Sequence, residues 1–317
     1  MKILVTGSSG YVGMVLSRYF SEKGIPVTGI DVRENHAWKG NENFDFIECD
    51  VTDRDAVRSV FRRIEPTHVI HLAYLMTPLH DKKKEYDIDV NGTINVYEES
   101  KDCKSVIQFI EMSSTSAYGG WPDNPLWIKE DHPLRPRGYR YGINKREIEE
   151  YMAYHPPGKD MKLIIFRMCT AVGPSYHKKG GVVAILAKSP LIIKFSNRYA
   201  EVQFIHEDDL TAVFDLILND PGIEGIFNLA PDSYSTTRDL SKARISIPVP
   251  LFIMKGLTAI LWSLHLSTMR PPAVELSTYG IVADPRKLME RYDYEFRYGT
   301  KEAYFETVKE RKKRGTL

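Results

Sequence analysis

Residues 1–31, MKILVTGSSGYVGMVLSRYFSEKGIPVTGID, decide the fold that we expect for this chain of 317 residues. Residues 2–6 form a short apolar run followed by glycine, which is typical of a strand buried on both faces. Apolar residues then recur at helical spacing as far as Phe20, and a second apolar run, residues 25–30, ends on Asp31. A strand, a glycine-rich turn, a helix, a strand and a terminal acid together form half of a dinucleotide-binding unit.

The glycine-rich turn, GSSGYVG at residues 7–13, suits a pyrophosphate. Glycines let the turn close tightly, bring backbone N–H groups against the phosphates and let the helix pack close to the strand. The start of a helix carries partial positive charge and spare N–H donors, so it holds an anion without a basic side chain. Asp31 is placed to accept hydrogen bonds from the adenosine ribose and to repel a 2′-phosphate, which favours NAD over NADP. Arg33, two residues on, would soften that preference.

Composition and charge argue against several classes of protein. The chain is 43% hydrophobic and 27% charged, which is ordinary for a globular protein. Its net charge of +1 is too small to attract nucleic acid or an anionic membrane. Its three cysteines, residues 49, 103 and 169, show no metal-ligand spacing, and we expect no metal. An odd number of cysteines without a targeting segment predicts a reducing, cytoplasmic setting.

One apolar stretch, PLFIMKGLTAILWSLHL at residues 250–266, needs an interpretation of its own. It is shorter than 18 residues, and Lys255 and His265 interrupt it, so it is not typical of a membrane-spanning helix. We predict an amphipathic helix that covers a substrate cavity or a partner rather than a membrane contact.

The third predicted strand, residues 43–48, leads to another acid. The letters that follow it are CDVTD, in which Asp50 is placed to receive the adenine amino group while Val51 packs on the ring. Thr52 or Asp53 would also begin the next helix as its N-cap. The two interpretations are compatible because they use different residues.

The fourth predicted strand, THVIHLA at residues 67–73, ends on a small side chain. This suits a backbone that passes close to the phosphates and ribose of a dinucleotide. His71 lies inside the strand, and we expect it to be packed or hydrogen-bonded rather than a ligand or a base. Further along, Asp208 or Asp209 is expected to cap a helix that precedes a last strand at residues 225–230.

Hydroxyl side chains and a Tyr-x-x-x-Lys spacing mark the predicted active site. The fifth strand, residues 105–112, opens into SSTSAYG at 113–119, and four successive hydroxyl residues are poor core material. In an open α/β sheet, ligands bind at the carboxyl ends of the strands. Tyr141 and Lys145 are four residues apart in a helix that we expect to continue to about Tyr154, so both project from one face.

Several motifs occur together in a fixed order. They are TGSSGYVG at residues 6–13, Asp31, CDVTD at 49–53, HLA at 71–73, VNGTINV at 90–96, SSTSAYG at 113–119, YGINK at 141–145, the segment 167–174 and FIHEDDL at 204–210. With these motifs the chain resembles the extended short-chain dehydrogenase/reductases. That family includes the NAD-dependent sugar-nucleotide epimerases, such as UDP-galactose epimerase, and the dehydratases. The motifs are far more specific for the superfamily than for the reaction.

The resemblance implies an α/β fold of the Rossmann type, a doubly wound parallel sheet flanked by helices with a smaller C-terminal lobe. The implied domains are an NAD-binding domain at residues 1–174, to which 205–232 return, and a substrate-binding lobe at 175–204 and 233–317.

A homodimer is also implied, because members commonly pair through the helix that carries the Tyr-x-x-x-Lys spacing and the helix around residues 92–101. Ile148, Tyr151 and Met152 would offer apolar area for that contact.

By resemblance, Ser114, Tyr141 and Lys145 carry the chemistry. Tyr141 would act as general base toward a substrate hydroxyl while the nicotinamide takes a hydride, and would return the proton in the reverse step. A free phenol has a pKa of about 10, and Lys145 together with the positive nicotinamide ring would lower it toward neutrality. Ser114 would hydrogen-bond the reacting oxygen. The predicted cofactor contacts are Gly7, Ser9, Gly10, Tyr11, Val12, Gly13, Asp31, Arg33, Asp50, Val51, Leu72, Ala73, Asn91, Met112, Tyr141, Lys145 and Arg167.

Departures from the family narrow the reaction. Sugar-nucleotide dehydratases carry Asp-Glu directly after the catalytic hydroxyl residue, whereas this chain has Thr115 and Ser116, which are not acids near pH 7. Dehydration is therefore disfavoured. Many UDP-sugar enzymes have Asn in place of Thr170, and Arg in place of Val202 as a diphosphate contact. Arg270 resembles another phosphate-binding arginine of the epimerases, so the predicted substrate contacts are Ser116, Thr170 and Arg270.

Three functions follow from these residues. The leading hypothesis is an NAD-dependent epimerase that oxidises a ring hydroxyl of a sugar or sugar nucleotide, lets the keto intermediate turn, and reduces its other face. The first alternative is a dehydrogenase or reductase of a smaller alcohol or ketone with net turnover, which Thr170 and Val202 favour. The second is an NAD-binding scaffold without turnover, against which the complete Ser-Tyr-Lys set argues.

Overall fold

The computed structural model describes residues 1–34, 40–176, 182–195, 197–267 and 270–317. The chain divides into two compact units. Unit 1 contains residues 1–113, 144–166 and 211–227, and unit 2 contains residues 114–143, 167–210 and 228–317. Of the predicted substrate lobe, residues 177–181, 196 and 268–269 lie outside the described residues.

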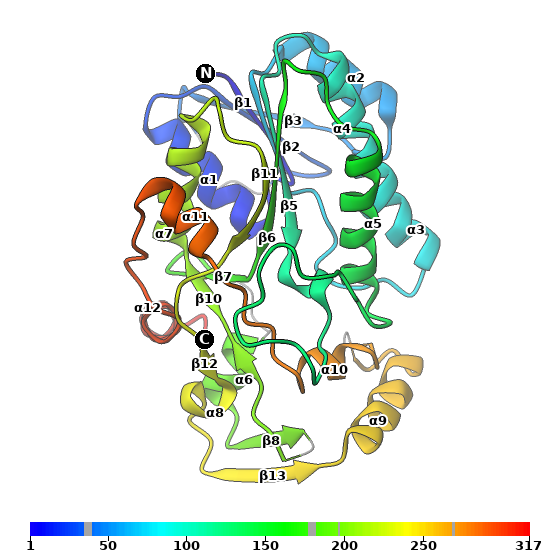
Figure 1. Ribbon diagram of the computed structural model, residues 1–317, viewed down its shortest axis with the longest axis vertical. Coiled ribbons are helices and arrows are strands. Elements are labelled where there is room, and N and C mark those ends of the chain that lie inside the picture. Colours follow the sequence, from blue (N-terminus) through cyan, green and yellow to red (C-terminus); the bar gives the residue numbers. More distant parts are fainter. Residues whose placement is uncertain (35–39, 177–181, 196, 268–269) are drawn as a thin grey trace. The chain divides into compact units, whose positions relative to one another are not determined.

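Seven strands form the central sheet, in the order β11-β6-β5-β4-β1-β2-β3 (Figure 1). The pairs β1–β2, β1–β4, β2–β3 and β4–β5 are parallel. From β1, the strands β2 and β3 follow on one side of the sheet and β4, β5 and β6 on the other. A doubly wound sheet binds its ligand at the point where the strand order reverses in this way. The predicted Rossmann-type fold is therefore confirmed. The strands are β1 (Ile3–Thr6), β2 (Val27–Asp31), β3 (Phe44–Glu48), β4 (His68–His71), β5 (Gln108–Ser114), β6 (Lys162–Met168) and β11 (Gly225–Leu229).

Helices lie on both faces of the sheet (Figure 1). One face carries α1 (Tyr11–Glu22) and α7 (Glu207–Leu218), which the ion pair between Lys23 and Asp215 connects at 2.8 Å. The other face carries α2 (Arg54–Ile64), α4 (Gly92–Asp102) and α5 (Arg140–Tyr154). A short helix, α3 (Lys82–Tyr86), and a π-helical turn, η1 (Asp87–Asn91), lead into α4.

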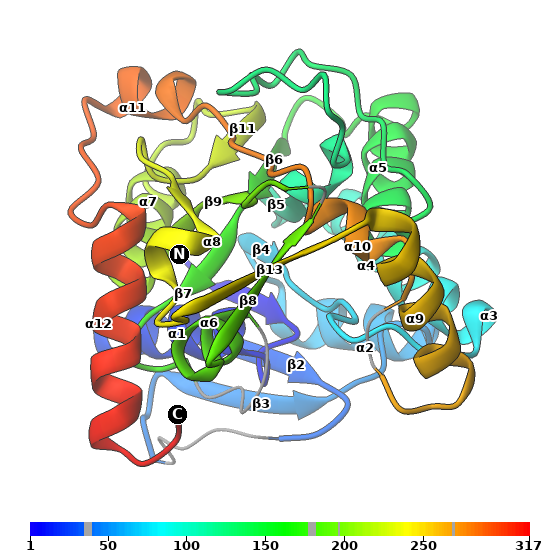
Figure 2. The same ribbon diagram turned by 90° about the horizontal axis from the view of Figure 1, so that it is seen from below.

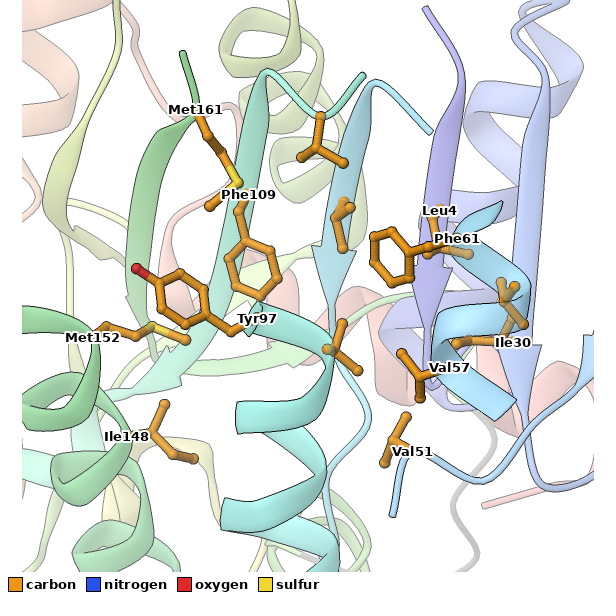
Figure 3. Close-up of a cluster of buried hydrophobic side chains, with 14 of the residues drawn as sticks. Leu4, Ile30, Val51, Val57, Phe61, Tyr97, Phe109, Ile148, Met152 and Met161 are labelled. Atoms are coloured by element: carbon orange, nitrogen blue, oxygen red, sulfur yellow. The ribbon is translucent and has the colours of Figure 1, made fainter. Parts of the chain in front are cut away.

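The apolar cluster of unit 1 fills the space between the sheet and α2, α4 and α5 (Figure 3). Phe109 of β5 meets Tyr97 of α4 edge to face, with 5.3 Å between ring centroids. Ile148 and Met152 of α5 are each 1% exposed and belong to this cluster. The prediction that they offer apolar area to a second copy is therefore wrong, because their side chains are already buried in their own unit.

Within its described residues, unit 2 contains three small sheets, which pair β7 with β10, β8 with β13 and β9 with β12. Figure 2 shows β13 alongside β8 and leading into α9. The strands are β7 (Thr170–Val172), β8 (Leu191–Phe195), β9 (Glu201–Val202), β10 (Phe204–His206), β12 (Ser235–Thr236) and β13 (Ile245–Val249). The helices are η2 (Thr115–Tyr118), α6 (Val182–Lys188), α8 (Thr237–Leu240), α9 (Leu251–Ser263), α10 (Ala273–Leu276), α11 (Arg286–Tyr292) and α12 (Thr300–Lys313).

Helix α7 begins two or three residues earlier than a cap at Asp208 or Asp209 predicts. Because it starts at Glu207, Asp208 and Asp209 lie in its first turn and do not cap it. The backbone N–H of Asp208 instead donates to Nδ1 of His206, at 3.1 Å. The expectation of an aspartate cap is therefore corrected, although acids in this first turn still favour the positive end of the helix dipole.

The apolar stretch at residues 250–266 contains α9, as predicted. Ile253, Leu257 and Ile260 recur along one side of this helix and are between 48% and 60% exposed. Within the described residues, no helix is long and apolar enough to cross a membrane. The expectation that α9 covers a substrate cavity or a partner stays a prediction.

Candidate functional site

The glycine turn after β1 has no room for a side chain at Gly7 or at Gly13. A Cβ on Gly7 would lie 2.7 Å from the backbone of Leu72 and of Ala73, and Gly7 has a φ of +64°, which glycine adopts without strain. A Cβ on Gly13 would lie 2.3 Å from the carbonyl oxygen of Gly7. The turn therefore passes directly against the end of β4, and α1 packs directly against the turn.

The start of α1 suits an anion. Its N-cap residue, Gly10, has no side chain to accept hydrogen bonds from the first turn, and that turn contains no acidic residue. The first N–H groups of a helix point along its axis and carry partial positive charge. Together with the glycine turn, this end of α1 fits the pyrophosphate of a dinucleotide.

Asp31 at the end of β2 is tied to the same turn. Its Oδ2 accepts a hydrogen bond from the backbone N–H of Ser9 at 3.1 Å, and its Oδ1 accepts one from Val32 at 2.8 Å. The hydroxyl of Ser9 donates to the carbonyl oxygen of Arg33, at 2.7 Å. Because each carboxylate oxygen has a further lone pair, Asp31 is oriented by these bonds and can still accept from ribose hydroxyls.

Asp50 and its neighbours adopt the expected turn. Oδ1 of Asp50 accepts hydrogen bonds from the backbone N–H and the hydroxyl of Thr52, at 2.9 and 2.8 Å. Asp53 is the N-cap of α2, which confirms the capping prediction. Val51 is buried, and a Cβ on Gly92 would lie 2.7 Å from it. Contacts of Asp50 and Val51 with adenine stay predictions.

A buried polar network closes the end of β4. The hydroxyl of Thr6 accepts hydrogen bonds from the backbone N–H groups of Leu72 and Ala73, each at 3.1 Å. His71 is bonded through its two ring nitrogens to the hydroxyls of Thr6 and Thr93, at 2.8 and 2.9 Å. Burial, with a smaller contribution from Lys145, lowers the pKa of His71 to about 3, so the ring is neutral. The prediction of a hydrogen-bonded histidine is confirmed.

Ser114 ends β5 and begins the turn η2. Its Oγ accepts hydrogen bonds from the backbone N–H and the hydroxyl of Ser116, at 3.2 and 3.0 Å. A Cβ on Gly142 would lie 2.5 Å from the carbonyl oxygen of Ser116. The start of α5, where Tyr141 lies, therefore packs directly on the turn that Ser114 begins.

Helix α5 carries both Tyr141 and Lys145, as the spacing predicts. The ring of Tyr141 lies 6.0 Å from that of Tyr139, between centroids. Lys145 is 2% exposed, and its ammonium donates to Oε1 of Glu111 at 2.9 Å and to the carbonyl oxygen of Met112 at 2.5 Å. Two residues of the predicted set thus share one face of a helix, and the lysine is anchored to β5.

Asn144 connects α5 to a second buried acid. Its side chain donates to Oδ2 of Asp89 at 3.1 Å, and the backbone N–H of Leu75 donates to Oδ1 at 2.9 Å. Burial raises the pKa of Asp89 to about 6, against the opposing effects of these hydrogen bonds and of Lys145. Asp89 is thus bonded to Asn144, the residue that directly precedes the predicted catalytic Lys145.

Sequence reasoning missed Glu111. It lies in the predicted fifth strand, and a lone acid in an otherwise apolar strand was the available signal. Glu149, one turn after Lys145 on α5, was missed as well and accepts a short hydrogen bond from the hydroxyl of Ser113. Neither acid belongs to a motif.

The predicted substrate contacts lie on separate elements of unit 2. Ser116 lies in η2, and Thr170 begins β7 and is exposed. The guanidinium of Arg270 lies 5.1 Å from the ring centroid of Trp262. Their contacts with a substrate stay predictions.

Arg167 and Asn91, two predicted cofactor contacts, form hydrogen bonds with other residues of the protein. Arg167 is buried and donates to the hydroxyl of Tyr118 at 3.0 Å and to the carbonyl oxygen of Glu130 at 2.7 Å. The side chain of Asn91 donates to Asp87 at 2.8 Å. Their part in cofactor binding stays a prediction.

A cavity of about 520 Å³ in unit 1 lies away from all these residues. Thr67, Gln108 and Lys162 line it, and they lie at or just before the amino ends of β4, β5 and β6. Parallel sheets of this type bind their ligands at the carboxyl ends of the strands. The cavity is therefore not the predicted cofactor site.

Comparison with known proteins decides the family. Residues 3–230 match the model of the NAD dependent epimerase/dehydratase family. The chain belongs to that family. As a member it is an NAD-dependent enzyme. The glycine turn, the start of α1 and Asp31 fit this cofactor.

Curated relatives of this family member include an uncharacterized protein of Sinorhizobium fredii, 26% identical over 96% of this chain and 77% of that protein. A UDP-glucuronate 4-epimerase of Thermodesulfobacterium geofontis is 30% identical over 54% of this chain and 56% of that enzyme. A UDP-glucose 4-epimerase of Erwinia amylovora is 30% identical over 57% of this chain and 56% of that enzyme. The matches thus span about half the length of these two epimerases.

Solved structures share the whole fold of this epimerase/dehydratase family member. The UDP-glucose 4-epimerase of Thermotoga maritima, solved with UDP-glucose, has a TM-score of 0.78 at 21% identity and covers 99% of both chains. The Bordetella bronchiseptica enzyme WbmG, solved with NAD and UDP, has a TM-score of 0.77 at 19% identity, covering 99% of this chain and 95% of that one. Such a likeness establishes the fold.

Proposed function

We propose that this protein is an NAD-dependent epimerase of a nucleotide sugar, which it oxidises transiently to a keto sugar and then reduces on the other face. The observation that carries the proposal is the placement of Tyr141 and Lys145 one turn apart on α5, where α5 packs on the turn that Ser114 begins. The 4-epimerases among its relatives act on UDP-sugars, which supports a UDP-sugar as substrate.

Each residue of the set has a defined part in the proposed reaction. The phenol oxygen of Tyr141 removes the proton from the ring hydroxyl that is oxidised and returns it when the keto group is reduced. The Lys145 ammonium favours the phenolate through its positive charge. Ser114 donates a hydrogen bond to the reacting oxygen and fixes its position. NAD supplies the hydride acceptor in the first half of the reaction and the hydride donor in the second.

The residues beside Ser114 support epimerisation over dehydration. Elimination of water needs an acid beside the reacting sugar, and Thr115 and Ser116 supply hydroxyls that stay protonated near pH 7. The hydroxyl of Ser116 is moreover bonded to Ser114 at 3.0 Å. A substrate that is oxidised here is therefore expected to be reduced again rather than dehydrated.

The residues at two positions where this chain departs from many UDP-sugar enzymes favour a second candidate, a dehydrogenase or reductase of a smaller alcohol. Val202 lies in β9, paired with Ser235 of β12, and supplies no charge for a diphosphate. Thr170 is exposed at the start of β7. An enzyme of this kind would release product and NADH together.

The test is incubation of the purified protein with NAD and a panel of UDP-sugars, following sugar products by nuclear magnetic resonance and NADH by absorbance. An epimer that forms without net NADH supports the proposal. NADH that rises in proportion to product contradicts it and supports the dehydrogenase.

The matched variants for this test are Tyr141→Phe and Tyr154→Phe, on the same helix. We expect Tyr141→Phe to lower turnover by at least about 100-fold because the general base is lost. Tyr154 is 81% exposed, and its variant should retain full turnover. Turnover that survives Tyr141→Phe would remove the phenol from the mechanism.

A further inference from the structure

Strand β5 carries a carboxylate at a place that is completely buried. Glu111 is 0% exposed and pairs across the sheet with His71 of β4. Acids are almost never fully buried unless they are paired, and a glutamate is an unfavourable residue for a strand interior. The position therefore calls for a specific partner.

The partner is found on the face of β5 that looks toward α4 and α5. Because side chains alternate along a strand, Phe109, Glu111 and Ser113 share one face. Phe109 packs into the apolar cluster of Figure 3, and Ser113 donates to Glu149 of α5. Between them, Glu111 accepts a hydrogen bond from Lys145 at 2.9 Å.

The Lys145 ammonium is held from three sides. Oε1 of Glu111 and the carbonyl oxygen of Met112 accept from it, and the ring centroid of Tyr74 lies 3.7 Å away, which is a cation–π contact. With 2% of its side chain exposed, Lys145 has little contact with water. An opposite charge that lies against a buried cation offsets part of the cost of removing that cation from water.

We infer that Glu111 is a positioning residue for the acid–base chemistry of Tyr141: it fixes the Lys145 ammonium, in place and in its charged form, one helical turn from the phenol. The inference rests on the proposed function, in which Tyr141 is the general base. Glu111 acts through Lys145.

Other titratable groups also face Lys145. Burial raises the pKa of Glu111, while the charge of Lys145 acts in the opposite direction and Glu149 acts with burial. Asp89 bonds to Asn144, and Glu149 accepts from Ser113, so both carboxylates have hydrogen-bond partners away from the ammonium.

The neighbouring ring groups carry no charge that could replace Glu111. His71 is neutral, because burial lowers its pKa to about 3. Tyr74 presents its ring face to the ammonium. Glu111 is thus the carboxylate in direct contact with the charge of Lys145.

Removal of this carboxylate has a definite electrostatic consequence. In Glu111→Gln the ammonium is left buried without an opposite charge against it, so its charged form is destabilised. The phenolate of Tyr141 then loses a favourable neighbour. We expect this loss to outweigh the removal of the negative charge of Glu111, which acts in the opposite direction, so Tyr141 should titrate at a pH about one unit higher. In Glu111→Asp the charge remains on a shorter side chain, so a smaller upward shift is expected.

The experiment is an ultraviolet titration of tyrosinate on the full chain, without substrate. The chain has 18 tyrosines, so the titration of Tyr141 is taken as the difference between each protein and its Tyr141→Phe partner. Glu99→Gln is the matched control. Glu99 is also a buried acid of unit 1, and it accepts from Arg54 at 2.8 Å and from Arg58. Its loss should destabilise the fold without moving the titration of Tyr141.

An upward shift in Glu111→Gln that Glu111→Asp largely reverses and Glu99→Gln lacks supports the inference. An unchanged or lowered titration in Glu111→Gln overturns it and leaves Glu111 with a structural role. Where Glu111→Gln does not fold, Glu111→Asp decides: a small upward shift supports the inference, and no shift overturns it.

This titration uses no substrate, so the two proposals can fail separately. A chain that shows the shift but converts no UDP-sugar would contradict the proposed function alone. A chain that epimerises a UDP-sugar but shows no shift would contradict the role of Glu111 alone.

Discussion

Gly13 shows how closely single residues of the glycine turn are packed. Its substitution by Ala would place a Cβ 2.3 Å from the carbonyl oxygen of Gly7, so the turn would have to move. Such overpacking costs about 1–3 kcal/mol, and we expect the dissociation constant for NAD, measured by calorimetry, to rise at least about tenfold.

Gly256 in α9 is the matched control, because a Cβ on this residue would have nothing within 4 Å. Gly256→Ala should leave NAD binding unchanged and stabilise the chain by about 0.5–1 kcal/mol, since alanine favours a helix interior. Equal NAD affinities for Gly13→Ala and the parent chain would show that the turn does not hold the pyrophosphate.

We predict that Asp31 determines the preference between the two nicotinamide cofactors. Asp31→Asn removes the charge that would accept from the ribose and repel a 2′-phosphate. We expect NAD to bind about tenfold more weakly, since hydrogen bonds to charged groups contribute about 1.5–3 kcal/mol, and NADP to bind more tightly. Calorimetric titration with each cofactor measures both. Asp45→Asn, an exposed acid on β3, is the control that should change neither affinity.

At the scale of elements, α5 carries both core residues and predicted site residues. Ile148 is 1% exposed within the apolar cluster, whereas Tyr154 on the same helix is 81% exposed. Ile148→Ala should lower the free energy of unfolding by about 2–5 kcal/mol, because it leaves a cavity. Tyr154→Ala should change it by less than about 0.5 kcal/mol. Denaturant unfolding of the two variants gives both values, and similar values would mean that Ile148 is not in the core.

The turn η1 makes stability depend on pH through Asp89. The folded pKa of about 6 lies above the unfolded value of about 3.9, so the contribution of Asp89 to stability is fully present below pH 4 and is lost as the pH rises through 6. Relative to Asp89→Asn, the parent chain should lose roughly 2–3 kcal/mol of unfolding free energy between pH 4 and 7. If the difference in unfolding free energy between the parent chain and Asp89→Asn does not vary with pH, Asp89 has the same pKa in the folded and unfolded states.

The elements were largely predictable, because local patterns determine them. The run before Gly7 specifies β1, the spacing of Tyr141 and Lys145 requires a helix, and Asp53 caps α2 as its position indicates. The start of α7 was not predictable to the residue, because His206 supplies the group that accepts from its first turn.

Long-range contacts were out of reach of the sequence. Ile148 looked available for a second copy because nothing local shows that α5 packs over β5 and α4. Glu111 looked like one more strand residue because its partner lies 34 positions along the chain. A homodimer therefore stays a prediction without an assigned apolar face.

At the scale of the whole molecule, the two compact units divide the predicted site. The boundary falls between residues 143 and 144, within α5, so Tyr141 belongs to unit 2 and Lys145 to unit 1. The glycine turn and Asp31 lie in unit 1, and the predicted substrate residues, Ser116, Thr170 and Arg270, lie in unit 2. The predicted cofactor residues and the predicted substrate residues therefore belong mainly to different units.

We propose that the same hydride leaves the sugar and returns to it while Tyr141 moves the proton. A UDP-sugar deuterated at the carbon that epimerises tests this directly, with mass spectrometry of the product formed in ordinary water. We expect the epimer to retain the deuterium, and Tyr141→Phe to form almost none of it. An epimer that has exchanged its deuterium for solvent hydrogen would contradict transient oxidation and the account built on it.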